Sequence, residues 1–431
     1  MAVGGAAPGL FDASEALPRE RLRDLQLERV SALLREVLPR NPFYVRKLGG
    51  TASVASWADF QALPFTTKAE VAEDQLARPP FGTNVTYPLE QYTRLHQTSG
   101  TTGKAPLRVL DTPASWDWWA RCWGHVYHAA GVGPGDRVFF AFSFGPFIGF
   151  WAAFEGARTV GAMTVPGGGM STAQRLDAML ETHATVLCST PTYALRLIEV
   201  ASERGINLAA SAVRTTIHAG EPGASIPAVR ERIEHGFGAR CFDHTGMSEV
   251  GATGFTCGER AGVHLIESEF VFEVIDPSTG RLVPAGEQGE LIVTNLGRPG
   301  APVIRYRTGD LVRIDQAACA CGRTFARLQG GILGRTDDML VVRGVNIFPS
   351  AIEGVVREFD SVNEFRIQVR SERGMSEIRV LLDATGEAGE VLAEQVARRL
   401  NERLMLRVPC QVVEAGSLPR FELKARRIEY V

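Results

Sequence analysis

The stretch DRVFFAF, residues 136–142, begins with two charged residues and continues as a short run of apolar side chains. Such a run, bounded by turn residues, predicts a strand that is buried on both faces. Four more segments contain a short apolar run and end in small or polar residues: 161–166, 184–191, 213–222 and 239–246. Amphipathic segments at 172–183 and 226–237 lie between them and predict helices. This alternation predicts a layered α/β body with a largely parallel sheet.

The two ends of the chain have different patterns. Apolar residues at helical spacing predict a helix from Leu22 to Leu38. After Asp338, two alternating strand patterns lie between two helical ones, which predicts a small α+β unit. We therefore expect a large layered α/β N-terminal domain over residues 1–334, a hinge at 335–337, and a small mobile α+β C-terminal domain over 338–431.

The composition argues against several classes of protein. The chain has 431 residues, of which 45% are hydrophobic and 22% are charged, and its formal net charge is −3. Such a balance gives no argument for nucleic acid or a membrane surface as a partner. The first residues lack the basic start and apolar run of a secretory signal, and the seven cysteines are an odd number. These features favour a cytoplasmic protein with reduced thiols and no membrane-spanning segment.

The segment HQTSGTTGKAPLRVL, residues 96–110, has the composition of an anion-binding loop. Glycines free its backbone, small hydroxyl side chains supply rotatable donors, and a lysine supplies a cation. The residues concerned are Thr98, Ser99, Gly100, Thr101, Thr102, Gly103 and Lys104. Their spacing differs from that of the usual phosphate loop, in which the glycines stand farther apart. A phosphate chain is the ligand that the pattern suggests, and a polar surface turn is the alternative.

Three cysteines and one histidine form a second pattern: Cys257, His264, Cys319 and Cys321. Three thiolates and one imidazole are a common ligand set of structural zinc sites, although the Cys319–Cys321 spacing is tighter than usual. Four protein ligands would leave no open position, so no water-activating role follows. The alternative is a group of buried reduced thiols, as we expect for the other cysteines, Cys122, Cys188, Cys241 and Cys410.

Six motifs in a fixed order carry a resemblance to a known family: TSGTTGKAP (98–106), GEP (220–222), DHTGMSE (243–249), YRTGD (306–310), GRTDDMLVVRGVNIFPS (334–350) and LPRFELKARRIEYV (418–431). NPFYVRKLGG and LPFTTKAEV near the N-terminus extend the match. On these residues the chain resembles the adenylate-forming (acyl-CoA synthetase) superfamily and, within it, the phenylacetate–CoA ligase-like branch. The resemblance covers nearly the whole length.

The resemblance implies an ATP-dependent acid–thiol ligase that releases AMP and pyrophosphate. A carboxylate attacks the α-phosphate of ATP, and coenzyme A then displaces AMP, after rotation of residues 338–431 about Asp337 opens a path for the thiol. Two alternatives stay open: an enzyme that loads a carrier protein's phosphopantetheine, and a nucleotide-binding protein without catalysis. The expected ligands are ATP, Mg²⁺, coenzyme A and a small aromatic carboxylic acid, with a structural Zn²⁺ and a homodimer as further hypotheses.

The resemblance also implies roles for single residues. The loop at 98–104 would wrap the β- and γ-phosphates, and Glu249 matches the carboxylate that holds Mg²⁺. Lys424 aligns with the lysine that bridges the incoming carboxylate and the α-phosphate. Asp310 matches the acceptor of both ribose hydroxyls, and Arg335 matches a second contact to ribose or phosphate.

Two segments would flank the adenine, and their residues are Gly220, Glu221, Pro222, Asp243, His244 and Thr245. The family usually has an aromatic residue, stacked on adenine, at the position of Thr245. This departure leaves three alternatives: a contact through His244, a contact through Phe242, or an altered pocket.

The pocket for the acid is expected where aromatic residues follow the strand at 136–142. Its predicted lining is Phe142, Phe147, His218, Ala219 and Gly220. The two small residues leave room for a flat ring, and the imidazole could hydrogen-bond an ortho amino or hydroxyl group. We therefore expect an aryl or arylacetic acid, with anthranilate- or benzoate-like acids and phenylacetate all left open. A histidine that only completes the core is the alternative for His218.

Overall fold

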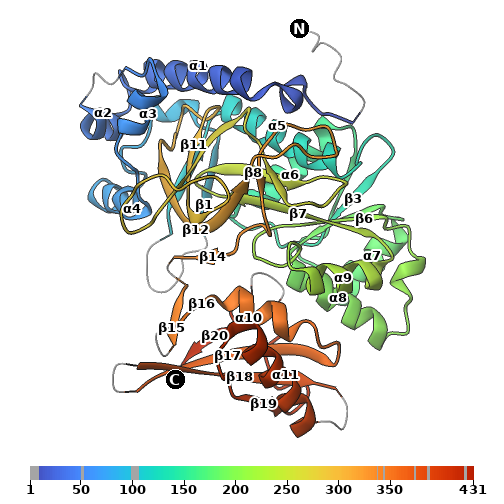
Figure 1. The fold of residues 1–431 in the computed structure, drawn as a ribbon. Helices are drawn as coiled ribbons and strands as arrows, with labels where there is room; N and C mark the ends of the chain where they lie inside the picture. The colour runs from blue at the N-terminus through green and yellow to red at the C-terminus, as the bar shows by residue number, and fades with distance from the viewer. Residues whose placement is uncertain are drawn as a thin grey trace.

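The computed structural model describes residues 9–49, 53–98, 106–336, 338–342, 345–372, 375–385, 389–421 and 425–431. Figure 1 shows a large body, coloured from blue to light orange, and a smaller unit below it in orange and red. The chain leaves the large body after β14 (Gly334–Arg335), and the described residues from β15 onward form the smaller unit.

Helices form the N-terminal end of the large body. They are η1 (Ala13–Ala16), α1 (Arg19–Val37), α2 (Pro42–Leu48), α3 (Trp57–Ala62) and α4 (Lys68–Ala77). The helix predicted from Leu22 to Leu38 is confirmed by α1, whose apolar stripe is buried. Ser56 and Thr67 begin α3 and α4 with capping boxes, in which side chain and backbone satisfy each other's hydrogen bonds.

A 12-stranded sheet forms the centre of the large body, and one part of it is parallel. That part consists of β4 (Met163–Pro166), β3 (Arg137–Phe140), β5 (Val186–Ser189), β6 (Thr215–His218) and β7 (Arg240–Met247), in this spatial order. Each of these strands overlaps one of the five predicted strand segments. The predicted α/β body is therefore confirmed for residues 136–247.

Helices cover both faces of the parallel part (Figure 1). On one face, α5 (Pro113–Ala129) and α6 (Ile148–Thr159) pack against side chains that include Ile217 and Phe242. On the other face, α7 (Thr172–Glu181), α8 (Pro191–Glu203) and α9 (Pro227–Phe237) pack against side chains that include Leu187 and Cys241. Because successive residues of a strand point to opposite faces, these contacts fix the face of every strand-end side chain.

The rest of the main sheet is antiparallel, so the prediction of a largely parallel sheet is wrong for this half. Its strands are β8 (Gly251–Thr256), β9 (Val263–Leu265), β10 (Phe270–Ile275), β11 (Gln288–Asn295), β12 (Tyr306–Asp315), β13 (Arg327–Leu328) and β14. Parallel neighbours need a crossover connection, usually a helix. This described stretch contains no helix, so its strands pair with antiparallel neighbours.

A separate hairpin of β1 (Arg94–Gln97) and β2 (Arg108–Asp111) flanks the segment that is predicted to bind phosphate. Two short helices, η2 (Leu89–Gln91) and η3 (Leu208–Ala210), complete the large body. Across the described residues, the structure has no helix with the length and apolar character needed to cross a membrane.

The smaller unit is an α+β unit with its own apolar core. Its elements are β15 (Leu340–Val342), β16 (Val345–Ile347), α10 (Pro349–Val356), β17 (Val362–Glu372), β18 (Met375–Ala384), α11 (Gly389–Leu404), β19 (Cys410–Val413) and β20 (Ile428–Tyr430). The 6-stranded sheet has the order β16-β15-β18-β17-β20, with β19 beside β18. Ile352, Val380 and Val396 are among its buried core residues. The predicted fold class is confirmed, while the exact domain boundaries and the hinge stay predictions.

Candidate active site

The carboxyl ends of β5, β6 and β7 place Ser189, His218 and Asp243 side by side on the face covered by α8 and α9. The backbone register pairs Ser189 with His218 and His218 with Asp243. All three side chains are buried. Ligands of open parallel sheets bind beyond the carboxyl ends of the strands. The predicted site residues of β6 and β7 therefore lie where a ligand is expected.

The His218 imidazole is fixed as a hydrogen-bond acceptor. The Ser189 hydroxyl donates to the Thr190 carbonyl oxygen at 3.1 Å, so its oxygen accepts from His218 Nδ1–H at 3.2 Å. This tautomer leaves Nε2 unprotonated, and Nε2 has no hydrogen-bond partner among the described residues. Burial lowers the pKa of His218 to about 4, so the ring is neutral at neutral pH.

The Glu221 carboxylate lies at the N-terminus of α8. It follows Gly220, whose φ of +96° favours glycine. Glu221 Oε1 accepts the backbone N–H of Thr192 at 2.9 Å, and Oε2 accepts the backbone N–H of Ala425, also at 2.9 Å. Ala425 follows the predicted catalytic residue Lys424, which itself lies outside the described residues. A carboxylate that was predicted to flank adenine therefore contacts the C-terminal segment.

The residues of β7 alternate between the two faces of the sheet, and this alternation separates the predicted adenine contacts. Asp243 accepts a hydrogen bond from the Ser225 hydroxyl, and burial raises the pKa of its carboxyl to about 6. Thr245 lies on the same face as Asp243, and its hydroxyl oxygen is 3.1 Å from that of Thr253. These two residues share the strand-end face with His218.

His244 points to the opposite face, into the core below α5. Its ring centroid lies 4.2 Å from that of Trp123, and its Nδ1 is 2.8 Å from the Gly254 carbonyl oxygen. Phe242 belongs to the same buried cluster. The structure thus places both rings away from the face that carries Asp243 and His218. Of the three alternatives for the adenine contact, an altered pocket around the half-buried Thr245 fits this arrangement best.

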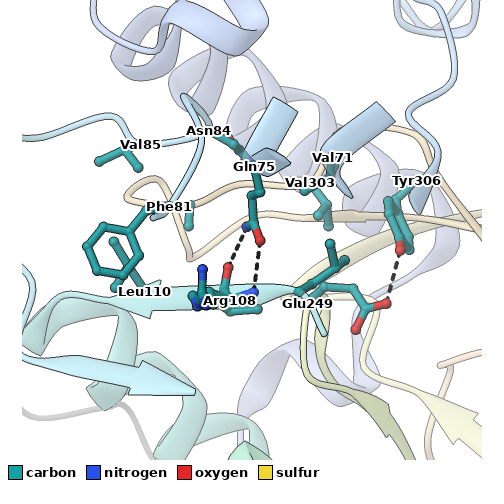
Figure 2. Close-up of a pocket in the computed structure, with 13 residues that line it drawn as sticks. Val71, Gln75, Phe81, Asn84, Val85, Arg108, Leu110, Glu249, Val303 and Tyr306 are labelled. Carbon is teal, nitrogen blue, oxygen red and sulfur yellow. Dashed lines mark hydrogen bonds between the residues drawn. The ribbon is translucent and has the colours of Figure 1, made fainter. Parts of the chain in front are cut away.

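The Glu249 carboxylate lies at one end of a small cavity between α4, β2 and β12 (Figure 2). The Tyr306 hydroxyl donates to Glu249 Oε1 at 2.9 Å, and Lys68 Nζ lies 3.8 Å from the same oxygen. Burial and the nearby Glu249 charge raise the pKa of Tyr306, so its hydroxyl stays a neutral donor. The Glu249 carboxylate, which is predicted to bind Mg²⁺, therefore has partners at Oε1 and lies beside a cavity.

A fully buried ion pair holds the turn that carries Glu249. Arg298 Nε and Nη2 donate to the two carboxylate oxygens of Asp111, both at 2.7 Å, and both side chains are 0% exposed. Arg298 Nη1 donates to the carbonyl oxygens of Ser248 at 3.1 Å and Glu249 at 3.2 Å. Asp111 ends β2, the strand that follows the predicted phosphate loop. One arginine therefore fixes the Glu249 turn relative to that strand.

Of the predicted phosphate loop, only Thr98 lies within the described residues. Its backbone N–H donates to the Leu107 carbonyl oxygen, and its hydroxyl oxygen accepts the Leu107 N–H, both at 3.0 Å. These two hydrogen bonds close the base of the segment. The rest of the loop lies outside the described residues, so its phosphate contacts stay predictions: Ser99, Gly100, Thr101, Thr102, Gly103 and Lys104.

Asp310 and Arg335, which are predicted to contact the ribose, are paired. They face each other across β12 and β14, and Arg335 Nη1 donates to Asp310 Oδ1 at 2.9 Å. A Cβ at Gly309 would lie 3.0 Å from Arg335 Nη2, so glycine allows this close approach. The predicted hinge residue Asp337 lies outside the described residues. The structure therefore brings the two predicted ribose contacts to one place.

Some residues predicted to line the acid pocket are buried in the core, and others are partly exposed. Phe142 is buried, and its ring stacks on Phe150 with the centroids 3.4 Å apart. Phe147 precedes α6 and is half-buried, as is Ala219 after β6. Pro222, in the predicted adenine segment, is exposed. Phe142 thus serves mainly to pack the core, while Phe147 and Ala219 keep part of their side chains accessible.

The four residues of the predicted zinc site converge in space. The possible ligand atoms of Cys257, His264, Cys319 and Cys321 all lie within 4.8 Å of one another. Cys257 Sγ is 3.8 Å from Cys319 Sγ, and Cys321 Sγ is 3.5 Å from His264 Nε2. His264 Nδ1 lies 3.0 Å from the Phe325 carbonyl oxygen and donates to it, which leaves Nε2 free to act as a ligand. These four groups are close enough to one another to be ligands of a single metal ion.

Several residues of the site were not predicted from the sequence. Lys68 and Tyr306 stand inside the quoted motifs LPFTTKAEV and YRTGD, so their position was a usable signal. Asp111 and Arg298 are 187 positions apart, and no local pattern links them. A buried charge pair of this kind is recognised only once the fold brings the two side chains together.

Asp111→Asn should strongly destabilise the protein, because it leaves the buried Arg298 guanidinium without a compensating charge. Removing one partner of such a pair costs roughly 3–5 kcal/mol in the free energy of unfolding, which chemical denaturation measures. The matched control is Glu36→Gln, which removes an exposed ion pair with Arg40 and should cost about 1 kcal/mol or less. Equally small losses in both variants would contradict the structural role of the buried pair.

Two family models match the chain. The model described as AMP-binding enzyme matches residues 47–297, and the model described as AMP-binding enzyme C-terminal domain matches residues 344–429. A phenylacetate-coenzyme A ligase of Thermus thermophilus is 34% identical, over 96% of this chain and 97% of its own. The ligase of the same name from Escherichia coli is 31% identical, over 97% of each chain.

Solved structures of 2-hydroxyisobutyryl-CoA ligase are similar to this chain over its whole length. The postadenylation state in complex with R3-HIB-AMP has a TM-score of 0.94 at 29% identity and covers 100% of this chain and 95% of that one. The thioesterification state, in complex with 2-HIB-AMP and CoA, has a TM-score of 0.75 at 30% identity and covers 100% and 94%. The arrangement of this chain is therefore more similar to the postadenylation state.

Proposed function

Because this chain belongs to the AMP-binding enzymes, in the branch of the phenylacetate–coenzyme A ligases, we propose that it joins a carboxylic acid to coenzyme A in two steps driven by ATP. The observation that carries the proposal is the similarity over nearly the whole chain, which includes the strand-end edge where the site residues meet. It extends to solved structures that hold an acyl-AMP and CoA. A carrier protein as acceptor is less supported, because the named relatives are CoA ligases.

In the first step, a carboxylate oxygen of the acid attacks the α-phosphorus of ATP, forms an acyl-AMP and expels pyrophosphate. The loop at 98–104 would hold the β- and γ-phosphates and the departing pyrophosphate. Asp310, held by its ion pair with Arg335, would accept hydrogen bonds from the ribose hydroxyls. Lys424 would bridge the carboxylate and the α-phosphate, where its charge offsets the charge of both reactants.

We assign Mg²⁺ binding to Glu249. Its carboxylate is a hard oxygen ligand, one oxygen of which already accepts from Tyr306, and Arg298 fixes its backbone. When bound, the ion would neutralise charge that develops on the phosphates. The Lys68 ammonium group, 3.8 Å from Glu249 Oε1, would add a positive charge beside the bound ion.

In the second step, the CoA thiolate attacks the acyl carbon of the adenylate, and the bond from that carbon to the phosphate oxygen breaks, which releases AMP. Rotation of residues 338–431 about Asp337 would open the path for the thiol.

A nucleotide-binding protein without catalysis is the rival function. The presence of both Glu249 and Lys424 argues against it, because a binding module has no use for a lysine on the smaller unit.

For the acid, we propose an aromatic ring that carries a hydrogen-bond donor beside its carboxylate. His218 Nε2 is a buried acceptor without a partner among the described residues, and leaving such an atom unpaired is costly. An ortho amino or hydroxyl group would satisfy it. Phe147 and Ala219 are half-buried, so part of each side chain is accessible for contact with an aromatic ring. This reasoning favours anthranilate- or salicylate-like acids over benzoate and over phenylacetate.

The direct test is a panel of these acids, with ATP and Mg²⁺, assayed by pyrophosphate release and then offered coenzyme A or a carrier protein. The proposal predicts acid-dependent pyrophosphate release, and a thioester together with AMP when coenzyme A is present. A thioester formed only with a carrier protein would favour the alternative acceptor. Absence of pyrophosphate release with every acid of the panel would contradict an aryl acid as substrate.

His218→Ala should reduce kcat/KM more for salicylate or anthranilate than for benzoate, because only the substituted acids can donate to Nε2. A neutral hydrogen bond contributes roughly 0.5–1.5 kcal/mol, which corresponds to a selectivity change of a few-fold to about tenfold. Measuring kcat/KM for each acid on both proteins decides the question. A parallel loss for all three acids would mean that His218 shapes the pocket without contacting the substituent.

Lys424→Ala should nearly abolish pyrophosphate release and leave thioester formation from pre-made acyl-adenylate largely intact. The reason is that the lysine is proposed to contact the reactants in the first step only. Rapid-mixing measurements of the two half-reactions separate these effects. Equal losses in both half-reactions would contradict a role limited to adenylation.

We also assign a structural zinc ion to Cys257, His264, Cys319 and Cys321, as their convergence supports. The purified protein should then contain about one zinc per chain, and a chelator should remove it together with thermal stability. Metal analysis and a thermal unfolding curve measure both. Protein prepared without a chelator and found free of zinc would make the three cysteines ordinary reduced thiols and His264 a histidine of the core.

A further inference from the structure

The C-terminal segment 425–431 is held against the large body by a small group of polar contacts. The Ala425 N–H donates to Glu221 Oε2 at 2.9 Å, and Arg427 Nη2 donates to the Thr192 hydroxyl oxygen at 3.1 Å. The Thr192 N–H in turn donates to Glu221 Oε1 at 2.9 Å. Thr192 and Glu221 therefore contact the residues one and three positions after Lys424.

The two partners in the large body, Thr192 and Glu221, are held in place by a contact with each other. Thr192 lies in the first turn of α8, whose free N–H groups and dipole favour a negative charge. The Glu221 carboxylate satisfies one of these N–H groups with Oε1, which leaves Oε2 directed at the C-terminal segment. Hydrogen bonds to a carboxylate are stronger than those between neutral groups.

The partner residues in the smaller unit are also fixed. Arg427 is nearly buried and lies 2.9 Å from Glu353 and 2.7 Å from Glu364, both of which belong to the smaller unit. Because Arg427 is held by these two carboxylates, its hydrogen bond to the Thr192 hydroxyl depends on the position of the whole smaller unit. The contacts thus join two bodies that are each rigid near the contact.

We propose that Glu221 and Thr192 form a docking latch, which holds the lysine-bearing segment in the arrangement used for adenylation and releases it for the thiol step. The proposal rests on the proposed function, because the two steps give the latch its role. It assigns Glu221 to positioning, whereas the sequence resemblance assigned it to adenine. The higher similarity to the postadenylation state than to the thioesterification state is consistent with a latch that is closed in this structure.

The test compares Glu221→Gln and Thr192→Val with the wild type in the two half-reactions. Losing a hydrogen bond to a charged group corresponds to roughly a tenfold to hundredfold change. Adenylation by Glu221→Gln should fall by that factor, while thioester formation from pre-made acyl-adenylate stays unchanged or becomes faster, and KM for ATP changes little. Thr192→Val removes only a neutral hydroxyl acceptor and should show the same split at smaller size.

Glu199→Gln is the matched control. Glu199 also contacts the smaller unit, through Arg420 at 3.1 Å, but Arg420 keeps a second carboxylate partner in Asp383 at 3.0 Å. This variant should leave both half-reactions within about twofold of the wild type, as expected for a partly exposed pair. An equal effect of Glu199→Gln and Glu221→Gln would overturn a specific latch.

A structural readout separates failure of the latch from failure of the proposed function. Hydrogen exchange of peptides that cover residue 425 should become faster in Glu221→Ala, because the Ala425 N–H loses its acceptor, whereas peptides of α1, which is far from the contact in the sequence and belongs to the large body, should not change. This measurement needs no acid substrate. Unchanged exchange at residue 425, or a raised KM for ATP with equal losses in both half-reactions, would overturn the latch and return Glu221 to nucleotide binding.

Discussion

The bidentate contact between Arg298 and Asp111 is the interaction on which the geometry of the site depends. It joins β2, which follows the predicted phosphate loop, to the turn that carries Glu249. Both side chains are 0% exposed, so neither charge has water as an alternative partner. The Trp119 ring, 5.5 Å from the guanidinium, adds a cation–π contact from α5. The segment proposed to bind phosphate and the carboxylate proposed to bind Mg²⁺ are far apart in the sequence, and this ion pair links the strand after the one to the turn that carries the other.

Successive side chains of the main-sheet strands point to opposite faces, and this alternation decides which side chains lie in the candidate site. On β7, Phe242 and His244 enter the core below α5, while Asp243 and Thr245 face the edge shared with His218. At the same edge the Glu221 carboxylate links α8 to the C-terminal segment. One strand-end edge therefore combines the proposed contacts to the acid with the proposed control of the smaller unit. This proximity gives a physical route by which docking of that unit and chemistry are coupled.

Local patterns were sufficient to predict α1, the strands β3 to β7 and the smaller α+β unit, because apolar periodicity reports burial directly. The antiparallel half of the sheet was not predicted, since short strands joined by turns carry no periodic signal for their order. The motifs led to Glu249, Asp310, Arg335 and the Cys/His group. In the structure Glu249 accepts a hydrogen bond from Tyr306, Arg335 pairs with Asp310, and the Cys/His ligand atoms lie close to one another. The packing role of Phe142 and the contact of Glu221 with Ala425 required the structure, because both depend on residues far away in the sequence.

In the proposed reaction, an oxygen of the acid becomes bonded to the α-phosphorus of ATP before coenzyme A reacts. The most direct measurement uses an acid labelled with ¹⁸O in its carboxylate, together with ATP, Mg²⁺ and coenzyme A, and determines the mass of the AMP formed. We expect AMP to gain one labelled oxygen, because the thiol attacks the acyl carbon and leaves that oxygen on phosphorus. Unlabelled AMP, or label recovered in pyrophosphate or phosphate, would contradict an acyl-adenylate intermediate.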